Sequence, residues 1–399
     1  MPDSLKPIRQ LRQTILRNHE LQARLFAIHA EDEFLTNLLE IAAAAGIALP
    51  ETAIKNLLRT NRKDWPAMDS VENTNGLTGW IPFNFSDGNV QWLYMGNERF
   101  VEPFSETTLR KLAYRPFNRL FRPQTDIGYL AERADTHPGL TLNGLIFHMS
   151  RCGSTLCAQA LAALDDTVVL SEPACFDALI HWRINSGSGD KNLQSRRLQD
   201  LLAALGQARR LSDRRLFVKT DCWHIRHIDG LLAAFPGVPW IFLYRDPVEV
   251  LVSQARLPGM INIPGVLMEH GLKPPEDLLI KPLAHAGWVL GQVLECAYQA
   301  LQSHEGGLPV NYRELPMALE TRIANHFRLN LDENSLAAVR NVYNANAKNP
   351  SQPFQADGAA KLAEASPEIL SIRQTWLAEP YRRLEELRRQ LLMERSGKA

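Results

Sequence analysis

The chain of 399 residues has no excess of either charge and no long apolar run. Lysine plus arginine and aspartate plus glutamate each number 44, so no bulk electrostatic attraction draws the protein to nucleic acid or to an anionic membrane. No window approaches the roughly 20 apolar residues of a membrane span, and the charged residues 1–15 do not resemble a secretory signal. We therefore expect a cytoplasmic protein without nucleic-acid or membrane partners, in which any anion site is built from a few local residues.

Cysteines are few, and their spacing predicts neither disulfides nor a metal site. The five cysteines are odd in number and include no C-x-x-C pair, which indicates reduced thiols in a cytoplasmic protein. His148, Cys152 and Cys157 lie close in the sequence but match no standard zinc spacing. We expect buried thiols that pack as small apolar groups and no bound metal.

The first third of the chain differs from the rest in the spacing of its apolar residues and in its aromatic content. Residues 5–64 place apolar side chains three and four apart, which predicts helices. Two aromatic-rich segments then flank the turn sequence SDGN at 86–89, which predicts a β-hairpin. We interpret residues 1–135 as an N-terminal α+β module that ends in a linker at 135–139. Its helices, within residues 1–64, offer a surface for self-association or for a partner protein.

From residue 142 onward, short apolar runs alternate with helical segments. The runs are GLIFHM (144–149), TVVLS (167–171), RLFVKT (215–220), PWIFLYR (239–245) and LPVNYREL (308–315). Buried strands that alternate with helices predict a parallel sheet flanked by helices. Residues 140–399 are therefore expected to form an α/β domain.

A strand–turn–helix sequence, HMSRCGSTLCAQAL at 148–161, carries the first candidate binding site. Gly153 lets the backbone approach a phosphate closely, and the amides of a helix that starts at Ser154 and Thr155 favour an anion. A nucleotide triphosphatase has lysine directly after the last glycine, in the pattern G-x-x-x-x-G-K-[ST]. Here Ser154 follows Gly153. The sequence therefore predicts a phosphate loop without the usual machinery for magnesium and a triphosphate.

The loop SRCGSTL resembles the 5′-phosphosulfate loop of the sulfotransferases that use 3′-phosphoadenosine-5′-phosphosulfate (PAPS), P-[KR]-[ST]-G-[ST]-T. Arg151 matches the basic residue, whereas Ser150 stands where proline is common and Cys152 where a hydroxyl residue is common. The resemblance implies a P-loop-like sulfotransferase fold. It also implies that the phosphosulfate is held by Arg151, Cys152, Gly153, Ser154, Thr155 and Leu156.

The sequence IFLYRDPVEVLVSQ at 241–254 resembles the 3′-phosphate site of the same family. In that family a strand ends in R-[ND]-P, and a serine follows the arginine by eight residues; Arg245 and Ser253 take these positions. A guanidinium group suits the task because it makes two charge-assisted hydrogen bonds to a phosphate. The Asp246-Pro247 pair also has an ordinary interpretation as the start of a helix.

Two segments of the C-terminal third resemble further nucleotide contacts of the family. NYREL at 311–315 is similar to a Y-E-D-L segment, which implies a nucleotide contact for Tyr312. FQADGAAKLAEAS at 354–366 is similar to a late loop whose lysine reaches the nucleotide in some members, which implies the same for Lys361.

Sulfuryl transfer needs a base for the proton of the acceptor and positive charge near the sulfuryl and bridging oxygens. Glu172 follows an expected strand, at the edge where open α/β sheets bind ligands. The resemblance implies that Glu172 is the base, as in tyrosylprotein sulfotransferases, and that Lys219 and Arg151 contact the transferred group. Asp221 takes the position of the histidine base in the K-T-H motif of small-molecule cytosolic sulfotransferases, and it remains the second candidate.

The expected function is transfer of a sulfuryl group from PAPS, without a metal, to a hydroxyl or amine acceptor, with 3′,5′-adenosine bisphosphate as the nucleotide product. The sequence leaves the acceptor open, whether a small molecule or a peptide. Two alternatives also remain open: a P-loop kinase that uses ATP, and a non-catalytic binding protein with the sulfotransferase fold.

Overall fold

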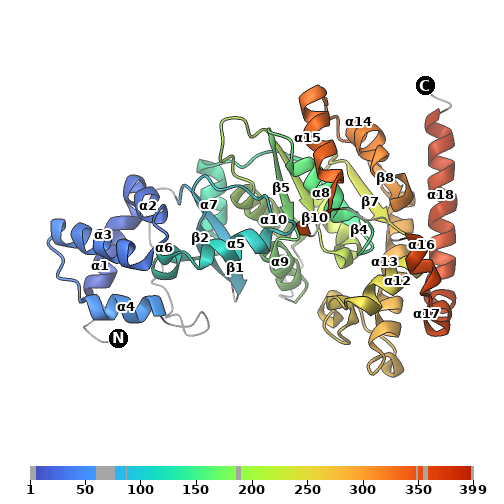
Figure 1. Ribbon diagram of the computed structural model, residues 1–399, viewed down its shortest axis with the longest axis horizontal. Helices are drawn as coiled ribbons and strands as arrows, with labels where there is room; N and C mark the ends of the chain where they lie inside the picture. The colour runs from blue at the N-terminus through green and yellow to red at the C-terminus, as the bar shows by residue number, and fades with distance from the viewer. Residues whose placement is uncertain are drawn as a thin grey trace.

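The computed structural model describes residues 6–59, 77–86, 88–185, 190–346, 349–353 and 358–396. A five-stranded parallel sheet flanked by helices lies at its centre, with strand order β5-β6-β4-β7-β8 (Figure 1). This confirms the predicted fold class, and each expected run forms a strand. The strands are β4 (Leu142–His148), β5 (Thr167–Ser171), β6 (Arg215–Lys219), β7 (Trp240–Tyr244) and β8 (Gly307–Asn311).

The strands are apolar because helices cover them. Every residue of β5 and of β7 is buried, as expected for parallel strands without a solvated face. Helix α8 (Ser154–Ala162) packs on β4, β5 and β6, while α13 (Pro282–Ser303) and α18 (Ala378–Ser396) pack on β8. These contacts bury the apolar faces of both layers.

The strand order brings five loops to one edge of the sheet. From the central β4 the chain passes to β5 at one margin, returns to β6, and then crosses to β7 and β8 on the other side. All neighbouring pairs are parallel, so the carboxyl ends of all five strands point the same way. Ligands of open α/β sheets bind at this edge, where the strand order reverses.

Helices and a small antiparallel sheet precede this domain and form one end of the molecule (Figure 1). They confirm the expected helices and hairpin; Asp87 of the hairpin turn lies outside the described residues. The indole N–H of Trp80 donates to the buried Gln22 Oε1 at 3.0 Å and joins the helices to the sheet. The elements are α1 (Lys6–Leu16), α2 (His19–Phe26), α3 (Glu31–Ala44), α4 (Glu51–Arg59), β1 (Trp80–Ser86), β2 (Asn89–Tyr94), α5 (Ser105–Ala113), α6 (Pro116–Leu120), β3 (Gln124–Asp126) and α7 (Tyr129–Thr136).

The N-terminal part packs directly against the α/β domain. Strand β1 contacts α9 (Ala174–Asn185), and α7 contacts α10 (Lys191–Leu205). Near the carboxyl end of β5, the N–H of Ser171 donates to Ser105 Oγ and the hydroxyl of Ser171 donates to Pro103 O, both at 2.8 Å. The two parts therefore meet at the carboxyl edge of the sheet. A domain boundary at 135–139 stays a prediction; α7 ends at Thr136, within that range.

Further helices and a two-stranded sheet complete the chain. None of the helices in the described ranges combines the length and the apolar character needed to cross a membrane. The remaining elements are η3 (Cys222–His227), α11 (Ile228–Ala234), α12 (Pro247–Arg256), η4 (Met260–Asn262), η5 (Met268–His270), η6 (Glu276–Leu278), η7 (Tyr312–Glu314), η8 (Leu319–Ile323), α14 (Ala324–His326), α15 (Glu333–Tyr343), β9 (Ala345–Asn346), β10 (Asn349–Pro353), α16 (Gly358–Ala363), α17 (Pro367–Ile372) and η9 (Arg373–Leu377).

Candidate active site

The turn between β4 and α8 has an unusual backbone. Ser150, Arg151 and Gly153 all have positive φ, at 69°, 50° and 85°; such conformations are costly for non-glycine residues and cluster at functional sites. The first helical bond of α8 runs from Cys157 N to Gly153 O at 3.1 Å, so the amides of residues 154–156 have no acceptor within the helix. A side chain at position 153 would clash, because a Cβ there would lie 2.8 Å from Cδ2 of Tyr312.

His148, the last residue of β4, holds this turn in place. Its Nδ1 accepts a hydrogen bond from the N–H of Ser150 at 2.9 Å, which assigns the ring proton to Nε2. Nε2 lies 2.9 Å from Thr220 O and 3.3 Å from Glu172 Oε1. Burial lowers the pKa of His148. A neutral imidazole therefore links the turn to the ends of β5 and β6, a role that the sequence did not suggest.

Glu172 and Lys219 form an ion pair at the ends of β5 and β6. The ammonium group of Lys219 contacts Glu172 Oε1, and it lies 3.4 Å from Ser171 Oγ and 4.9 Å from the ring centre of Phe104. Burial alone would raise the pKa of Glu172, but the charge of Lys219 and hydrogen bonds from His148 and Lys219 hold it well below its ordinary range. Glu172 is therefore ionised at neutral pH.

Asp221 lies two residues beyond Lys219 and caps η3. Burial, followed by the negative charge of Glu172, raises the pKa of Asp221 to about 7. The N–H of Asp221 donates to His224 Nδ1 at 3.2 Å, and His224 Nε2 donates to Asp177 Oδ1 at 2.7 Å. The site thus contains a second carboxyl group, that of Asp221. Unlike Glu172, Asp221 titrates near neutrality.

Asp177, Asp221 and His224 form one group, within the described ranges, that has the composition of a metal site. Their ligand atoms lie within 4.8 Å of one another. Both ring nitrogens of His224 are already used, since Nδ1 accepts from Asp221 N–H and Nε2 donates to Asp177. A cation at Nε2 would have to displace that proton, so hydrogen bonding alone accounts for the arrangement.

Arg245 follows β7 on the other side of the turn. Its guanidinium carbon lies 4.0 Å from the ring centre of Tyr312. Its Nε donates to Glu249 Oε2 at 2.6 Å, and Nη2 pairs with the same oxygen; both residues are buried. Glu249 therefore already engages the guanidinium group that the resemblance assigns to the 3′-phosphate. The spacing of four residues between Arg245 and Glu249 is a helical ion-pair signal that the sequence analysis missed.

The two remaining predicted nucleotide ligands lie on helices near this pair. Ser253 is half-buried on α12, and Lys361 is buried on α16, which packs against α12. At the start of α16, a Cβ on Gly358 would lie 3.1 Å from Glu249 Oε2. Helix α16 thus approaches the Arg245–Glu249 pair, while residues 354–357 of the expected late loop lie outside the described residues.

The side chains of Arg151 and Cys152 point to different surroundings. Arg151 Nη2 donates to Leu257 O at 2.7 Å. Cys152 is fully buried and donates its S–H to Leu243 O at 3.0 Å, and burial raises the pKa of its thiol to about 11. Cys152 can therefore offer a ligand only its backbone.

At one edge of the sheet, each of the five strands ends within three residues of a predicted site residue. Glu172 directly follows β5, and Lys219 is the last residue of β6. Because β5 and β6 lie on one side of β4, this acid–base pair lies on one side of the turn that holds Arg151. Arg245 and Tyr312, after β7 and β8, lie on the other side. The edge thus divides into an acid–base half and a cationic–aromatic half, with the glycine turn between them.

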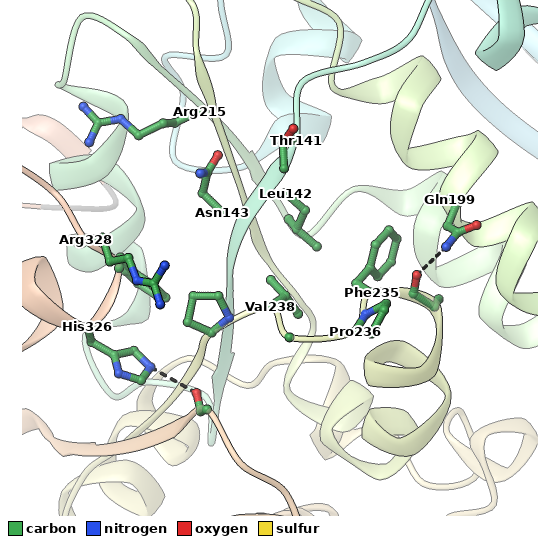
Figure 2. Close-up of a pocket in the computed structure, with 15 residues that line it drawn as sticks. Thr141, Leu142, Asn143, Gln199, Arg215, Phe235, Pro236, Val238, His326 and Arg328 are labelled. Atoms are coloured by element: carbon green, nitrogen blue, oxygen red, sulfur yellow. Dashed lines mark hydrogen bonds between the residues drawn. The ribbon is translucent and has the colours of Figure 1, made fainter.

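A cavity of about 750 Å³ lies at the opposite edge of the sheet (Figure 2). Its lining includes Asn143, Arg215 and Val238, which stand at or just before the amino ends of strands. Gln199 donates to Ala234 O at 2.6 Å, as the dashed line in Figure 2 shows. Because none of the predicted site residues lines this cavity, we place the candidate site at the carboxyl edge.

Several solved structures similar to this chain are sulfotransferases. One from Mycobacterium tuberculosis H37Rv is 14% identical, covers 63% of this chain and 81% of its own, and has a TM-score of 0.39. One from Mycobacterium avium is 16% identical, with coverages of 63% and 80% and a TM-score of 0.37. A sulfotransferase domain from the curacin biosynthetic pathway is 13% identical, with coverages of 62% and 98% and a TM-score of 0.35. No protein-family model matches the chain, and no curated protein matches it significantly.

Proposed function

We propose that the protein is a sulfotransferase that moves the sulfuryl group of PAPS to a hydroxyl or amine acceptor. One observation carries the proposal: Arg151, Lys219 and Arg245 follow three adjacent strands around a single glycine-containing turn. The chain as a whole has balanced charge. Such a local gathering of cations at the carboxyl edge favours a ligand with several anionic groups, and PAPS has a phosphosulfate at one end and a phosphate at the other.

The residues present fit such a ligand. The amides of residues 154–156 suit the 5′-phosphosulfate, with Arg151 beside it. Arg245 suits the 3′-phosphate, and we assign Ser253, Tyr312 and Lys361 to the same end of the nucleotide. Glu249 would then have to share Arg245 with the phosphate or move aside.

In the proposed reaction, Glu172 takes the proton of the acceptor while the acceptor oxygen or nitrogen bonds to sulfur. Lys219 and Arg151 stabilise the negative charge on the sulfuryl oxygens and on the bridging oxygen, whose bond to sulfur breaks. That bridging oxygen keeps the electron pair and leaves with the nucleotide. Bound PAPS supplies the activated sulfuryl group. Asp221 is the second candidate for the base because its pKa, raised to about 7, suits proton exchange near neutrality.

An ATP-dependent kinase remains the alternative enzyme, and a non-catalytic nucleotide-binding protein the alternative without turnover. The kinase is disfavoured because Ser154, and no lysine, follows Gly153 at the start of α8. The binding protein is disfavoured because it has no need for an ionised glutamate paired with a buried lysine.

The deciding experiment is calorimetric titration of the protein with 3′,5′-adenosine bisphosphate, with magnesium-ATP as the competing ligand. We expect the bisphosphate to bind more tightly. Arg245→Ala should weaken this binding by about ten- to a hundredfold, since it removes charge-assisted hydrogen bonds worth about 1.5–3 kcal/mol. Arg256→Ala, which changes an exposed arginine at the end of α12, the helix that follows Arg245, serves as the matched control and should leave the affinity unchanged.

Two outcomes would count against the proposal. Preference for magnesium-ATP would favour the kinase. Tight bisphosphate binding without release of sulfate or sulfated product from labelled PAPS, under any acceptor mixture, would favour the non-catalytic binding protein.

A further inference from the structure

The chain that follows α12 exposes apolar side chains. Residues 257–268, LPGMINIPGVLM, contain no charged residue, and we call them the apolar segment. Fifteen large apolar side chains are exposed in the described part of the protein, and five of them belong to these twelve residues: Leu257, Met260, Ile263, Val266 and Met268. Exposed apolar side chains that are concentrated in one segment mark a binding site more often than scattered single residues do.

The apolar segment is a fixed structure. It contains η4 and leads into η5, and the side chains of Ile261 and Leu267 are buried in the core between the exposed ones. His285 Nδ1 lies 2.9 Å from Ile261 O, and the side chain of Asn262 accepts from Gly259 N–H at 3.1 Å. The exposed side chains therefore stand on an anchored backbone, and in Figure 1 the segment lies beside α12 and α13.

The beginning of the apolar segment is tied to the phosphate turn. Arg151 Nη2 donates to Leu257 O at 2.7 Å. Gln254 donates to Ser150 Oγ at 3.1 Å and accepts from Gly259 N–H at 3.1 Å. The two residues of the turn with strained backbones therefore each contact the start of the segment, directly or through Gln254.

Residues just beyond the apolar segment connect it to Asp221. His270, two residues beyond it, has Nε2 3.5 Å from Asp177 Oδ1 and its ring centre 5.8 Å from that of Trp223. Asp177 accepts from His224, which accepts from the N–H of Asp221. The segment thus begins at the phosphate turn, where the sulfuryl group would be held. Beyond its end, His270, Asp177 and His224 connect it to Asp221, the second candidate for the base.

We propose that the apolar segment binds the non-reacting body of the acceptor, and that the acceptor is an uncharged or cationic amphiphile whose hydroxyl or amine is attached to an aliphatic or aromatic body. The inference rests on the proposed function and narrows its substrate class. An acidic peptide or polyanionic sugar would find no cation on the segment, while apolar bodies gain binding energy by covering such side chains. Met260 and Met268 adapt to bodies of different shape.

Photolabelling tests the site independently of turnover. The full chain is irradiated with 3-azioctanol, a photoreactive eight-carbon alcohol, and the adducts are mapped by peptide mass spectrometry. We expect saturable labelling of residues 257–268 that excess 1-octanol suppresses and the same concentration of ethanol does not. Ile263→Asn should reduce this labelling severalfold. Leu211→Asn, which changes an exposed leucine before the amino end of β6, is the matched control and should leave it unchanged.

The same series can be read in kinetics. With linear alcohols as acceptors, KM should fall up to about fourfold for each added methylene while kcat stays constant, and Ile263→Asn should flatten this trend. Absence of saturable labelling on the segment overturns the inference. So does a concentration-dependent dimer that Ile263→Asn dissociates, because a second copy would then cover the surface. The bisphosphate titration is independent of both readouts, so failure of the donor site is recognised separately.

Discussion

Glu172 combines three features at one residue: a left-handed backbone, an ion pair with Lys219 and a contact with His148. The first feature is uncommon for a residue with a side chain and persists where surrounding structure enforces it. His148 and the N–H of Glu172, which donates to Lys219 O at 2.7 Å, supply that enforcement. The carboxylate is thus held in one place between two strands.

Replacing this carboxylate should affect turnover and spare the nucleotide. For Glu172→Gln we expect sulfuryl transfer to fall roughly 10²–10⁴-fold, the usual loss for a general base. The affinity for 3′,5′-adenosine bisphosphate should stay within about twofold, because Glu172 contacts Lys219, which we assign to the sulfuryl and bridging oxygens, and contacts no residue assigned to the 3′-phosphate. Product formation from labelled PAPS measures the rate of sulfuryl transfer, and calorimetry measures the affinity for the bisphosphate. If Asp221→Asn lost more activity than Glu172→Gln, the base would be Asp221.

The raised pKa of Asp221 predicts a pH-dependent stability. Folding moves this pKa from the ordinary acidic range to about 7, so between these values the folded protein binds more protons than the unfolded one. Stability from this group therefore falls as the pH rises through that window. Asp221→Asn should raise the unfolding temperature near pH 8 by about 2–5 °C relative to wild type, and should lose most of this gain near pH 4.5.

Thermal unfolding followed by circular dichroism at the two pH values checks the prediction for Asp221. Asparagine has nearly the same shape as aspartate and cannot ionise, so the substitution isolates the charge. An equal difference between variant and wild type at both pH values would show that Asp221 does not titrate in this window.

At the scale of single residues, sequence and structure differ in the partners of the site. The resemblance to the sulfotransferases placed Glu172, Lys219 and Arg245 at strand ends, and all three lie there. Their neighbours His148 and Phe104 were not predicted as partners, because each reaches the site from a different strand or module. Such contacts depend on tertiary packing, which no local pattern encodes.

At the scale of elements, the strands were predictable and their order was not. Each strand of the central sheet is a short apolar run bounded by polar residues, which buried parallel strands require. The crossing from β6 over β4 to β7 depends on how the helices pack, and it decides which loops are neighbours. The division of the site into two halves follows from that crossing.

The turn between β4 and α8 offers an element-scale test with a built-in control. Gly153 and Gly237 both have positive φ, at 85° and 75°. A Cβ at 153 would lie 2.8 Å from the ring of Tyr312, whereas a Cβ at 237 would have no atom within 4 Å. Gly237→Ala should therefore cost only the backbone strain of about 1–2 kcal/mol. Gly153→Ala should cost more and should abolish bisphosphate binding.

Chemical denaturation measures the stabilities of the two glycine variants, and calorimetry measures their nucleotide affinities. Equal behaviour of Gly153→Ala and Gly237→Ala in both experiments would show that the crowded turn is not the nucleotide site.

At the scale of the whole molecule, the N-terminal part contributes to the candidate site. Ser105 and Pro103 hold Ser171, the residue before Glu172, and the ring of Phe104 lies over Lys219. Residues 1–135 were predicted to form a separate module, and the helices within residues 1–64 were predicted to offer a surface for a partner or for self-association. Both statements stay predictions. The packing of β1 on α9 shows that the module and the α/β domain share an interface in this chain.

This interface can be tested with one hydroxyl group. Ser105→Ala leaves the N–H of Ser171 buried without an acceptor, which should cost about 1–3 kcal/mol of stability. Turnover should fall as well, because Ser171 positions Glu172, while bisphosphate affinity should be kept. Ser212→Ala, on an exposed loop, is the control for loss of a serine hydroxyl. Unchanged turnover in Ser105→Ala would show that this contact of the N-terminal part does not contribute to the reaction.

The contact of Phe104 with Lys219 also bears on when, during synthesis of the chain, the candidate site can form. Ribosomes release the N-terminal residues first, so the segment around Phe104 is complete long before β6 and its lysine emerge. Tyr312 and helix α16 with Lys361 follow last. A nascent chain that stops before α16 would contain the central sheet but an unfinished edge. Because the edge draws on residues from Phe104 to Lys361, only a nascent chain that extends beyond Lys361 can assemble it.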